Sequence, residues 1–111
     1  MDDDALSLVL KATSDATRRK LLTALVQQGA TRVTDLARHY DMSLNGISKH
    51  IKVLEAAGLV TRKTHGREHL IEANLEPVKE IEAWFMRLKS IWDLRIDALE
   101  ELLTEKEEDN E

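Results

Sequence analysis

The sequence predicts a single, mainly α-helical domain in which about five helices accompany one small β-hairpin. Three observations lead to this fold class. Apolar residues recur every three or four positions through most of the chain, which is the spacing of one helix face. The period changes only between residues 59 and 73, where two short segments flank a glycine. The length of 111 residues suits one domain, which we place at 1–104, before an acidic tail at 105–111 that we expect to be frayed.

The composition excludes several classes of protein. Hydrophobic residues make up 42% of the chain and charged residues 33%, which is typical of a globular protein and not of a disordered one. Cysteine is absent, which excludes disulfides and thiolate sites and agrees with a reducing cytoplasm. No apolar run approaches the roughly 20 residues of a membrane span, and the start of the chain is acidic where a signal peptide would be basic. We therefore expect a cytoplasmic protein without a membrane partner.

Two helices are expected in the first thirty residues. Apolar residues between Leu6 and Ala12 indicate a short first helix. Asp15 is a favourable N-cap for a second helix, and Gly29 stands where a glycine commonly ends one. The apolar stripe of this second helix consists of Leu21, Leu22, Leu25 and Val26.

Residues 34–58 predict two further helices joined by a tight turn. Thr34 is placed to cap the first of them, and Asp41-Met42 forms the turn. Ser43 then caps the second, which ends at Gly58. The core-facing residues of this second helix are Ile47, Ile51 and Leu54.

Residues 59–73 predict a two-stranded hairpin. The segments 59–64 and 68–73 are short, and Gly66 between them can adopt a positive φ. The hairpin follows directly on the capped helix, so the elements come in the order helix, helix, turn, helix, hairpin. This is the order of a winged helix-turn-helix, with the hairpin as the wing.

A long helix is expected over residues 75–103, with Pro77 in its first turn. About 27 helical residues would form a rod of roughly 40 Å. Its apolar stripe is larger than one small domain can cover, so we expect it to hold two copies of the chain together in a homodimer. The residues assigned to dimerisation are Ile81, Trp84, Phe85, Leu88, Ile91 and Trp92.

The capped helix is the predicted DNA reader, because a helix fits the major groove of B-DNA and a neighbouring hairpin can reach phosphates. Asn45 and Lys49 carry groups suited to base edges. Ser48 suits bases or phosphates, and Ser43 combines capping with a possible phosphate contact. The full set of expected DNA-binding residues is Ser43, Leu44, Asn45, Ser48, Lys49, Lys52, Arg62, Lys63 and Arg67.

Four stretches resemble the ArsR-type winged helix-turn-helix repressors of bacteria. They are residues 10–22, 35–37, 43–60 and the final helix around Trp84-Phe85, Ile91-Trp92 and 95–102, and together they cover most of the chain. The stretch 43–60 is the most specific, and it is similar to the family's recognition helix and its exit. The resemblance implies a homodimer that binds operator DNA as a repressor released by a signal.

The chain departs from the family pattern at three places. Ala16 stands where the family usually has proline, and Gly46 replaces a small hydroxyl residue at a cost of about 1 kcal/mol in helix propensity. Close approach of the backbone to DNA is one explanation for that glycine. The family's metal sites use cysteines or an Asp/His set on the last helix, but this chain has no cysteine and no histidine after His69. We therefore assign no metal or other cofactor, and the effector is unknown.

The net charge of −5 needs explanation in a DNA-binding protein. Residues 1–73 carry eleven basic and nine acidic side chains, whereas residues 74–111 carry five and twelve. The negative charge therefore belongs to the last helix and the tail, which leaves the DNA-reading part slightly positive.

Alternative interpretations remain at each site. The polar face of the reading helix could be a solvated surface, and the cations of the hairpin could be edge charges that deter aggregation. Arg18, Arg19 and Lys20 could touch phosphate or form local salt bridges. No nucleophile or carboxylate pair has a convincing setting, so we do not expect an enzyme. The competing hypothesis is a winged-helix module that binds another protein on the last helix and has no specific affinity for DNA.

Overall fold

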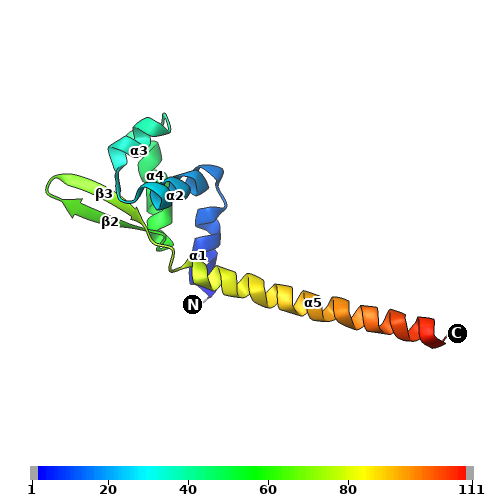
Figure 1. The fold of residues 1–111 in the computed structure, drawn as a ribbon. Helices are drawn as coiled ribbons and strands as arrows, with labels where there is room; N and C mark the ends of the chain where they lie inside the picture. Colours follow the sequence, from blue (N-terminus) through cyan, green and yellow to red (C-terminus); the bar gives the residue numbers. More distant parts are fainter. Residues whose placement is uncertain (1–2, 110–111) are drawn as a thin grey trace. The chain divides into compact units, whose positions relative to one another are not determined.

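The computed structural model describes residues 3–109, and the chain divides between Ile81 and Glu82 into two compact units. The first unit contains α1 (Asp3–Thr13), α2 (Ala16–Gln28), α3 (Val33–His39) and α4 (Leu44–Ala56). It also contains the strands β1 (Thr31–Arg32), β2 (Val60–His65) and β3 (Glu68–Ala73). The hairpin formed by β2 and β3 extends beyond the helices (Figure 1). The expected mainly helical winged helix-turn-helix fold is confirmed.

The wing is part of a three-stranded antiparallel sheet, so the expectation of a two-stranded sheet was wrong. The strand order is β1-β3-β2, and Thr31 and Arg32 pair with Ile71 and Leu70. The hairpin itself was predicted correctly, although β2 continues to His65 and the turn narrows to Gly66 and Arg67. Gly66 adopts a φ of 64°, as its position in a tight hairpin turn requires.

Side-chain caps explain where α2 and α4 begin. Asp15 accepts a hydrogen bond from the backbone N–H of Arg18 at 3.0 Å, and Ser43 accepts one from Gly46 at 3.0 Å. Both caps were expected from the sequence. Thr34 was expected to cap α3, but that helix begins one residue earlier at Val33, after Arg32, whose side chain makes no capping bond. Pairing of β1 with β3 fixes the backbone up to Arg32, which leaves Val33 as the first residue free to turn into the helix.

The core of the first unit is aliphatic and draws on every helix up to α4 and on the sheet. The hydrophobic stripe of α4, which the sequence assigned to the core, is completely buried. Val78 and Ile81 pack against the same core from the start of the last helix. The largest fully buried side chains are Leu21, Leu25, Ile47, Ile51, Leu54, Leu59, Ile71 and Val9.

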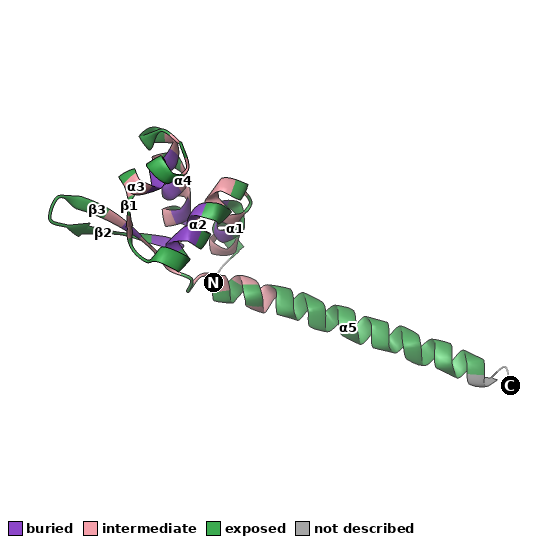
Figure 2. Ribbon diagram, turned by 45° about the horizontal axis from the view of Figure 1, so that its top comes forward, coloured by how far each residue is buried: buried purple, intermediate pink, exposed green. Residues whose placement is uncertain are grey.

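The last helix, α5, runs from Val78 to Asp109. It begins three residues later than position 75 and ends beyond position 103, so residues 105–109 are helical and not frayed. Residues 110 and 111 of the expected tail lie outside the described residues. At about 1.5 Å per residue, its 32 residues form a helix of roughly 48 Å. Nearly all of its surface is exposed (Figure 2). No helix in the described part of the chain is both long and apolar enough to cross a membrane.

Candidate nucleic-acid interface

Helix α4 presents three distinct surfaces around its buried stripe. Each residue of an α-helix is turned by about 100° from the one before it. This rotation places Asn45, Lys49 and Lys52 directly opposite the core-facing residues. It places Leu44 and Ser48 on the side toward the hairpin, and His50 on the other side, where the ring contacts α2. The helix therefore offers one outward face and two flanks with different neighbours.

The outward face of α4 is available to a ligand. Asn45, Lys49 and Lys52 are exposed, and within residues 3–109 their side chains make no hydrogen bond or ion pair. They follow one another at spacings of four and three residues, so they lie close together on the surface. An amide beside two ammonium groups can bind base edges and phosphates at the same time.

The N-terminus of α4 is shaped by Ser43 and Gly46. The hydroxyl of Ser43 is exposed and accepts the backbone N–H of Gly46. A Cβ on Gly46 would lie 3.2 Å from that hydroxyl oxygen and 3.3 Å from the Cε atom of Met42, which is tighter than ordinary contact. The capped turn therefore gives a structural reason for the glycine, without any contact to DNA.

A groove of about 400 Å³ lies between α4 and the hairpin. It brings together four of the residues that the sequence assigned to DNA binding, Leu44 and Ser48 from the helix and Arg62 and Arg67 from the hairpin. Leu44 is half exposed, at 52%, although it is a large apolar side chain. The groove joins the predicted reading helix to the predicted wing in one continuous surface.

The cations of the hairpin are not equivalent. The guanidinium of Arg62 donates to Glu55 of α4 at 2.8 Å, which fixes it at the edge of the groove. Lys63 points to the other face of the hairpin, because side chains alternate along a strand, and it pairs with Glu72. Arg67 lies at the exposed tip and makes no ion pair within the described part of the chain. Arg67 is therefore the cation of the wing that is freest to bind a phosphate.

Five residues that line the groove were not assigned to DNA binding from the sequence: Arg32, Val33, Thr34, Glu68 and His69. Arg32 is held by Asp35 and Glu68, each at 3.1 Å, so β1, α3 and the hairpin meet around its guanidinium. A strand of two residues gives no periodic pattern, so β1 could not be recognised. The only signal was the pair of β-branched residues on either side of Arg32, Thr31 and Val33, shortly after Gly29.

Arg18 and Arg19 serve the protein's own structure. Arg18 donates to the carbonyl oxygens of Ala12 and Lys11, and Arg19 donates to that of Thr13 at 2.8 Å. These carbonyls belong to the end of α1, which has no further helical partners to offer them. The bonds observed for Arg18 and Arg19 go to backbone carbonyls and are not the local salt bridges that the sequence offered as one alternative; the phosphate contact stays a prediction, and Lys20 is exposed.

The second unit, Glu82–Glu111, carries a long apolar stripe. Phe85, Leu88, Ile91 and Trp92 are exposed, and Trp84 is half-buried with its ring edge against Phe85. Ile81, the first residue assigned to dimerisation, belongs instead to the first unit and packs on its core. The stripe continues past the assigned residues, through Leu99, Leu102 and Leu103.

A family profile described as a helix-turn-helix domain matches residues 13–63 of this chain. The matched range starts at the end of α1 and includes both caps, α2, α3, α4 and the first four residues of β2. It therefore contains every residue of α4 assigned to DNA binding.

Similar proteins are regulators of transcription. An uncharacterised HTH-type transcriptional regulator of Bacillus subtilis, YuzN, is 37% identical over 79 residues, which are 66% of this chain and 86% of that protein. The transcriptional repressor SdpR of the same organism is 31% identical, over 70% of this chain and 86% of its own length. A solved structure of an ArsR-like transcriptional regulator from Rhodococcus is 30% identical, with a TM-score of 0.82 over 89% of this chain and 90% of the other.

Proposed function

Because the chain belongs to the ArsR family of winged helix-turn-helix transcriptional regulators, we propose that it is a homodimeric repressor of an imperfect palindromic operator. It is a sequence-specific DNA-binding regulator of transcription, in a family whose members are not enzymes. The observation that carries the proposal is the continuous surface formed by the outward face of α4 and the groove beside the hairpin.

We propose that α4 enters the major groove. Asn45 and Lys49 would bind base edges there, because an amide and an ammonium group offer the donors and acceptors that distinguish base pairs. Lys52 and Ser48 would bind the flanking phosphates. Ser43, which exposes its hydroxyl at the helix N-terminus, would bind a phosphate while it caps the helix. Leu44 is suited to contact with a thymine methyl group.

The hairpin would add contacts that carry little sequence information. Arg67 at the tip and Arg62 in the groove would bind phosphates. Lys63 would contribute less, because it lies on the opposite face and pairs with Glu72. Arg32 is a further candidate, since it lines the same groove.

Dimerisation through the last helix is supported by its exposed apolar stripe. Large apolar side chains such as Ile91 and Trp92 are each 64% exposed, and a contiguous stripe of this size is typical of an interaction surface. A second copy of the chain would cover Phe85, Leu88, Ile91 and Trp92, with Ile81 and Trp84 at the margin. A C2 dimer carries two identical reading helices, which match two half-sites about one helical turn apart.

Repression would follow from occupation of a promoter. This proposal is supported by the similarity to SdpR, which is described as a transcriptional repressor. We propose that the protein acts in the cytoplasm, where the bacterial chromosome is accessible to it.

The test is selection of bound fragments from a genomic library, followed by gel-shift titration at several salt concentrations. We expect a discrete set of sites with imperfect two-fold symmetry, and one dimer bound per site. Sites without symmetry would contradict the palindromic dimer. Absence of any retained fragment at low salt would overturn the DNA-binding surface and favour a module that binds another protein on α5.

A further inference from the structure

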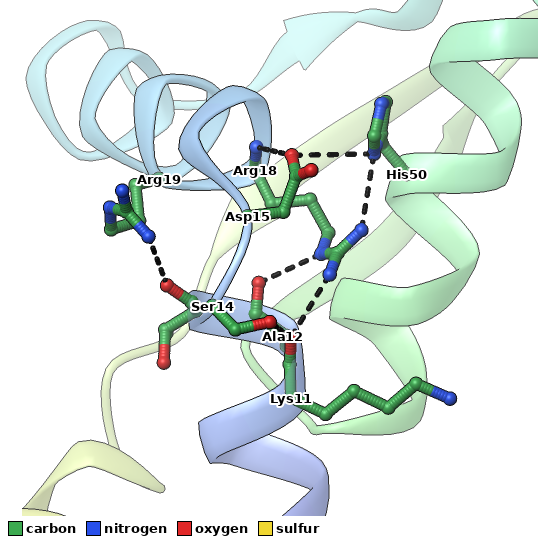
Figure 3. A network of polar contacts seen from close by, with 8 residues as sticks. Lys11, Ala12, Ser14, Asp15, Arg18, Arg19 and His50 are labelled. Carbon is green, nitrogen blue, oxygen red and sulfur yellow. Dashed lines mark hydrogen bonds and ion pairs between the residues drawn. The ribbon is translucent and has the colours of Figure 1, made fainter.

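A single guanidinium group connects the flank of α4 that carries His50 to the junction between α1 and α2. Arg18 donates from Nε to the carbonyl of Ala12 at 2.8 Å and from Nη2 to that of Lys11 at 3.0 Å. Its remaining nitrogen, Nη1, lies 3.4 Å from Nδ1 of His50 (Figure 3). One side chain of α2 therefore contacts both the end of α1 and the middle of α4.

Asp15 closes this network from the other side. It caps α2 by accepting the backbone N–H of Arg18, and its Oδ2 atom lies 4.0 Å from Nδ1 of His50. The imidazole is mostly covered, with 22% of its side chain exposed. His50 therefore faces a cation at hydrogen-bond distance and an anion slightly beyond it (Figure 3).

The chemistry of the guanidinium fixes the tautomer of His50. Arginine has five N–H donors, no acceptor, and a charge that persists at every physiological pH. Nδ1 of His50 must therefore present its lone pair to Arg18, and the ring proton resides on Nε2. A proton on Nδ1 would point at the N–H of Arg18, and in the ring protonated on both nitrogens it would also place a second positive charge beside the guanidinium. The contact thus requires the neutral ring.

We propose that His50 is a positioning residue for DNA recognition, in which the neutral imidazole holds α4 on Arg18 and protonation releases that hold. The inference rests on α4 as the DNA-reading helix. His50 directly follows Lys49, so a change in how its flank docks on α2 rotates or shifts the outward face. The expected consequence is a specific affinity that falls in mild acid.

The charged groups around His50 determine whether the affinity for DNA rises or falls in acid. The guanidinium of Arg18 on α2, at hydrogen-bond distance, opposes protonation of the ring. The carboxylate of Asp15, the N-cap of α2, favours protonation from 4.0 Å, beyond hydrogen-bond distance, so the closer cation sets the sign. From α1 it faces the end where Lys11 and Ala12 offer only carbonyls already bound by Arg18, while the ammonium of Lys11 points away (Figure 3). Asp3 and Asp4 lie at the opposite end of α1. On α4, Lys49 and Lys52 are exposed cations.

The test compares three proteins on the selected operator between pH 7.5 and pH 5.5. For the natural protein we expect about a tenfold loss of affinity from pH 7.5 to pH 5.5, as one charge-assisted hydrogen bond is lost. His50→Asn keeps an acceptor close to the position of Nδ1 and does not titrate, so its affinity should stay high and independent of pH. His50→Leu offers no acceptor and should bind weakly at both pH values.

The other histidines provide the control. His39 is exposed on α3 against the ring of Tyr40, and His39→Asn should keep the natural pH profile. Protonation of His65 or His69 on the hairpin would add positive charge near DNA and would strengthen binding in acid, the opposite sign. An acid loss that persists in His50→Asn, or natural affinity in His50→Leu, would overturn the proposal.

A second measurement separates this inference from the proposed function. Nitrogen-15 NMR of the free protein at pH 7.5 should show Nδ1 of His50 unprotonated and Nε2 protonated. The other tautomer would disprove the positioning contact whatever the protein does on DNA. A correct tautomer together with no operator binding would instead refute the reading role of α4.

Discussion

Asn45 and Lys49, like Lys52, have no partner within the described part of the protein, whereas His50 and Glu55 of the same helix are already bonded. Residues that are already bonded must exchange one partner for another when DNA arrives, whereas these two gain a partner outright. Their contribution should therefore appear as discrimination between sequences.

We expect Asn45→Ala and Lys49→Ala each to weaken binding to the selected operator by about 1 to 3 kcal/mol, and to affect random DNA much less. Fluorescence anisotropy on both DNAs at one salt concentration measures the difference. Lys106→Ala near the end of α5 matches the charge change of Lys49→Ala and serves as its control. Equal losses on the two DNAs would reassign Asn45 and Lys49 to phosphate contacts.

The carboxyl group of Asp15, the N-cap of α2, makes the stability of the fold depend on pH. The backbone N–H of Arg18 holds the pKa of the Asp15 carboxyl below its ordinary value of 3.8, with smaller contributions from the charges of Arg18 and His50. A carboxyl group whose pKa is lower in the folded protein than in the unfolded chain stabilises the fold. This stabilisation is fully present when the pH is above the ordinary pKa of 3.8. The stabilisation is lost as the pH falls below 3.8 through the lower pKa of the folded state.

Thermal unfolding of the natural protein and of Asp15→Asn between pH 2.5 and pH 6 checks this direction. Asparagine also caps helices but does not titrate, so the difference in melting temperature between the two proteins should shrink as the pH falls below 3.8. A difference that stays constant over this range would show that the carboxylate charge plays no part in the cap.

At the scale of elements, the hairpin and α4 are joined by Arg62 and Glu55, while the tip carries the free cation Arg67. Arg67→Ala should weaken binding to all DNA sequences and flatten its salt dependence, by roughly 0.9 in the slope of log affinity against log salt for each phosphate contact. Arg62→Ala should act in the same direction.

The matched control for these variants is Lys63→Ala, which removes a cation from the opposite face of the same hairpin. It should leave the salt slope nearly unchanged. If Lys63→Ala and Arg67→Ala reduced the slope equally, DNA would contact both faces of the hairpin and the groove beside α4 would lose its special role.

Elements with a strong period or a distinctive cap could be predicted from the sequence. The buried stripe of α4 and the glycine of the hairpin both carry such local signals. The strand β1 could not be predicted, because a two-residue strand is created by its partner Ile71 and not by its own pattern. The end of α5 was missed because the polar residues after Leu103 lack an apolar period, although glutamate and lysine favour helices intrinsically.

The residues of the candidate site, too, could be predicted only where a local pattern in the sequence places them. Residues on the outward face of α4 were predicted from their position relative to Ile47 and Ile51, whose burial is confirmed. Which cations of the hairpin are already paired depends on the partners Glu55 and Glu72, which come from another helix and another strand. Such pairing between elements has no signature in a local pattern.

For the whole molecule, the central question is what covers the stripe of α5. Leu88 lies within the stripe. Leu94, six residues later, is turned by about 120° from Leu88 around the helix axis. Both leucines are exposed, at 45% and 70%. They therefore allow the same substitution to be compared inside and outside the proposed interface.

We expect sedimentation of the natural protein to show a dimer at micromolar concentration. Leu88→Glu should convert it to a monomer, because a buried unpaired carboxylate is costly, and should abolish tight operator binding. Leu94→Glu should leave the dimer intact. A monomeric natural protein, or a dimer unaffected by Leu88→Glu, would contradict dimerisation through this stripe.

The ion pairs of the hairpin also bear on how such a protein would find its operator among the chromosome's many competing sites. Non-specific affinity for DNA grows with the number of free cations. A regulator with high non-specific affinity is bound mostly to sequences other than its operator. Glu55 and Glu72 hold Arg62 and Lys63 in pairs that are weak at an exposed surface and open readily. We therefore expect the protein to dissociate quickly from DNA other than its operator, and the arginine in the groove to bind a phosphate only where α4 fits the bases.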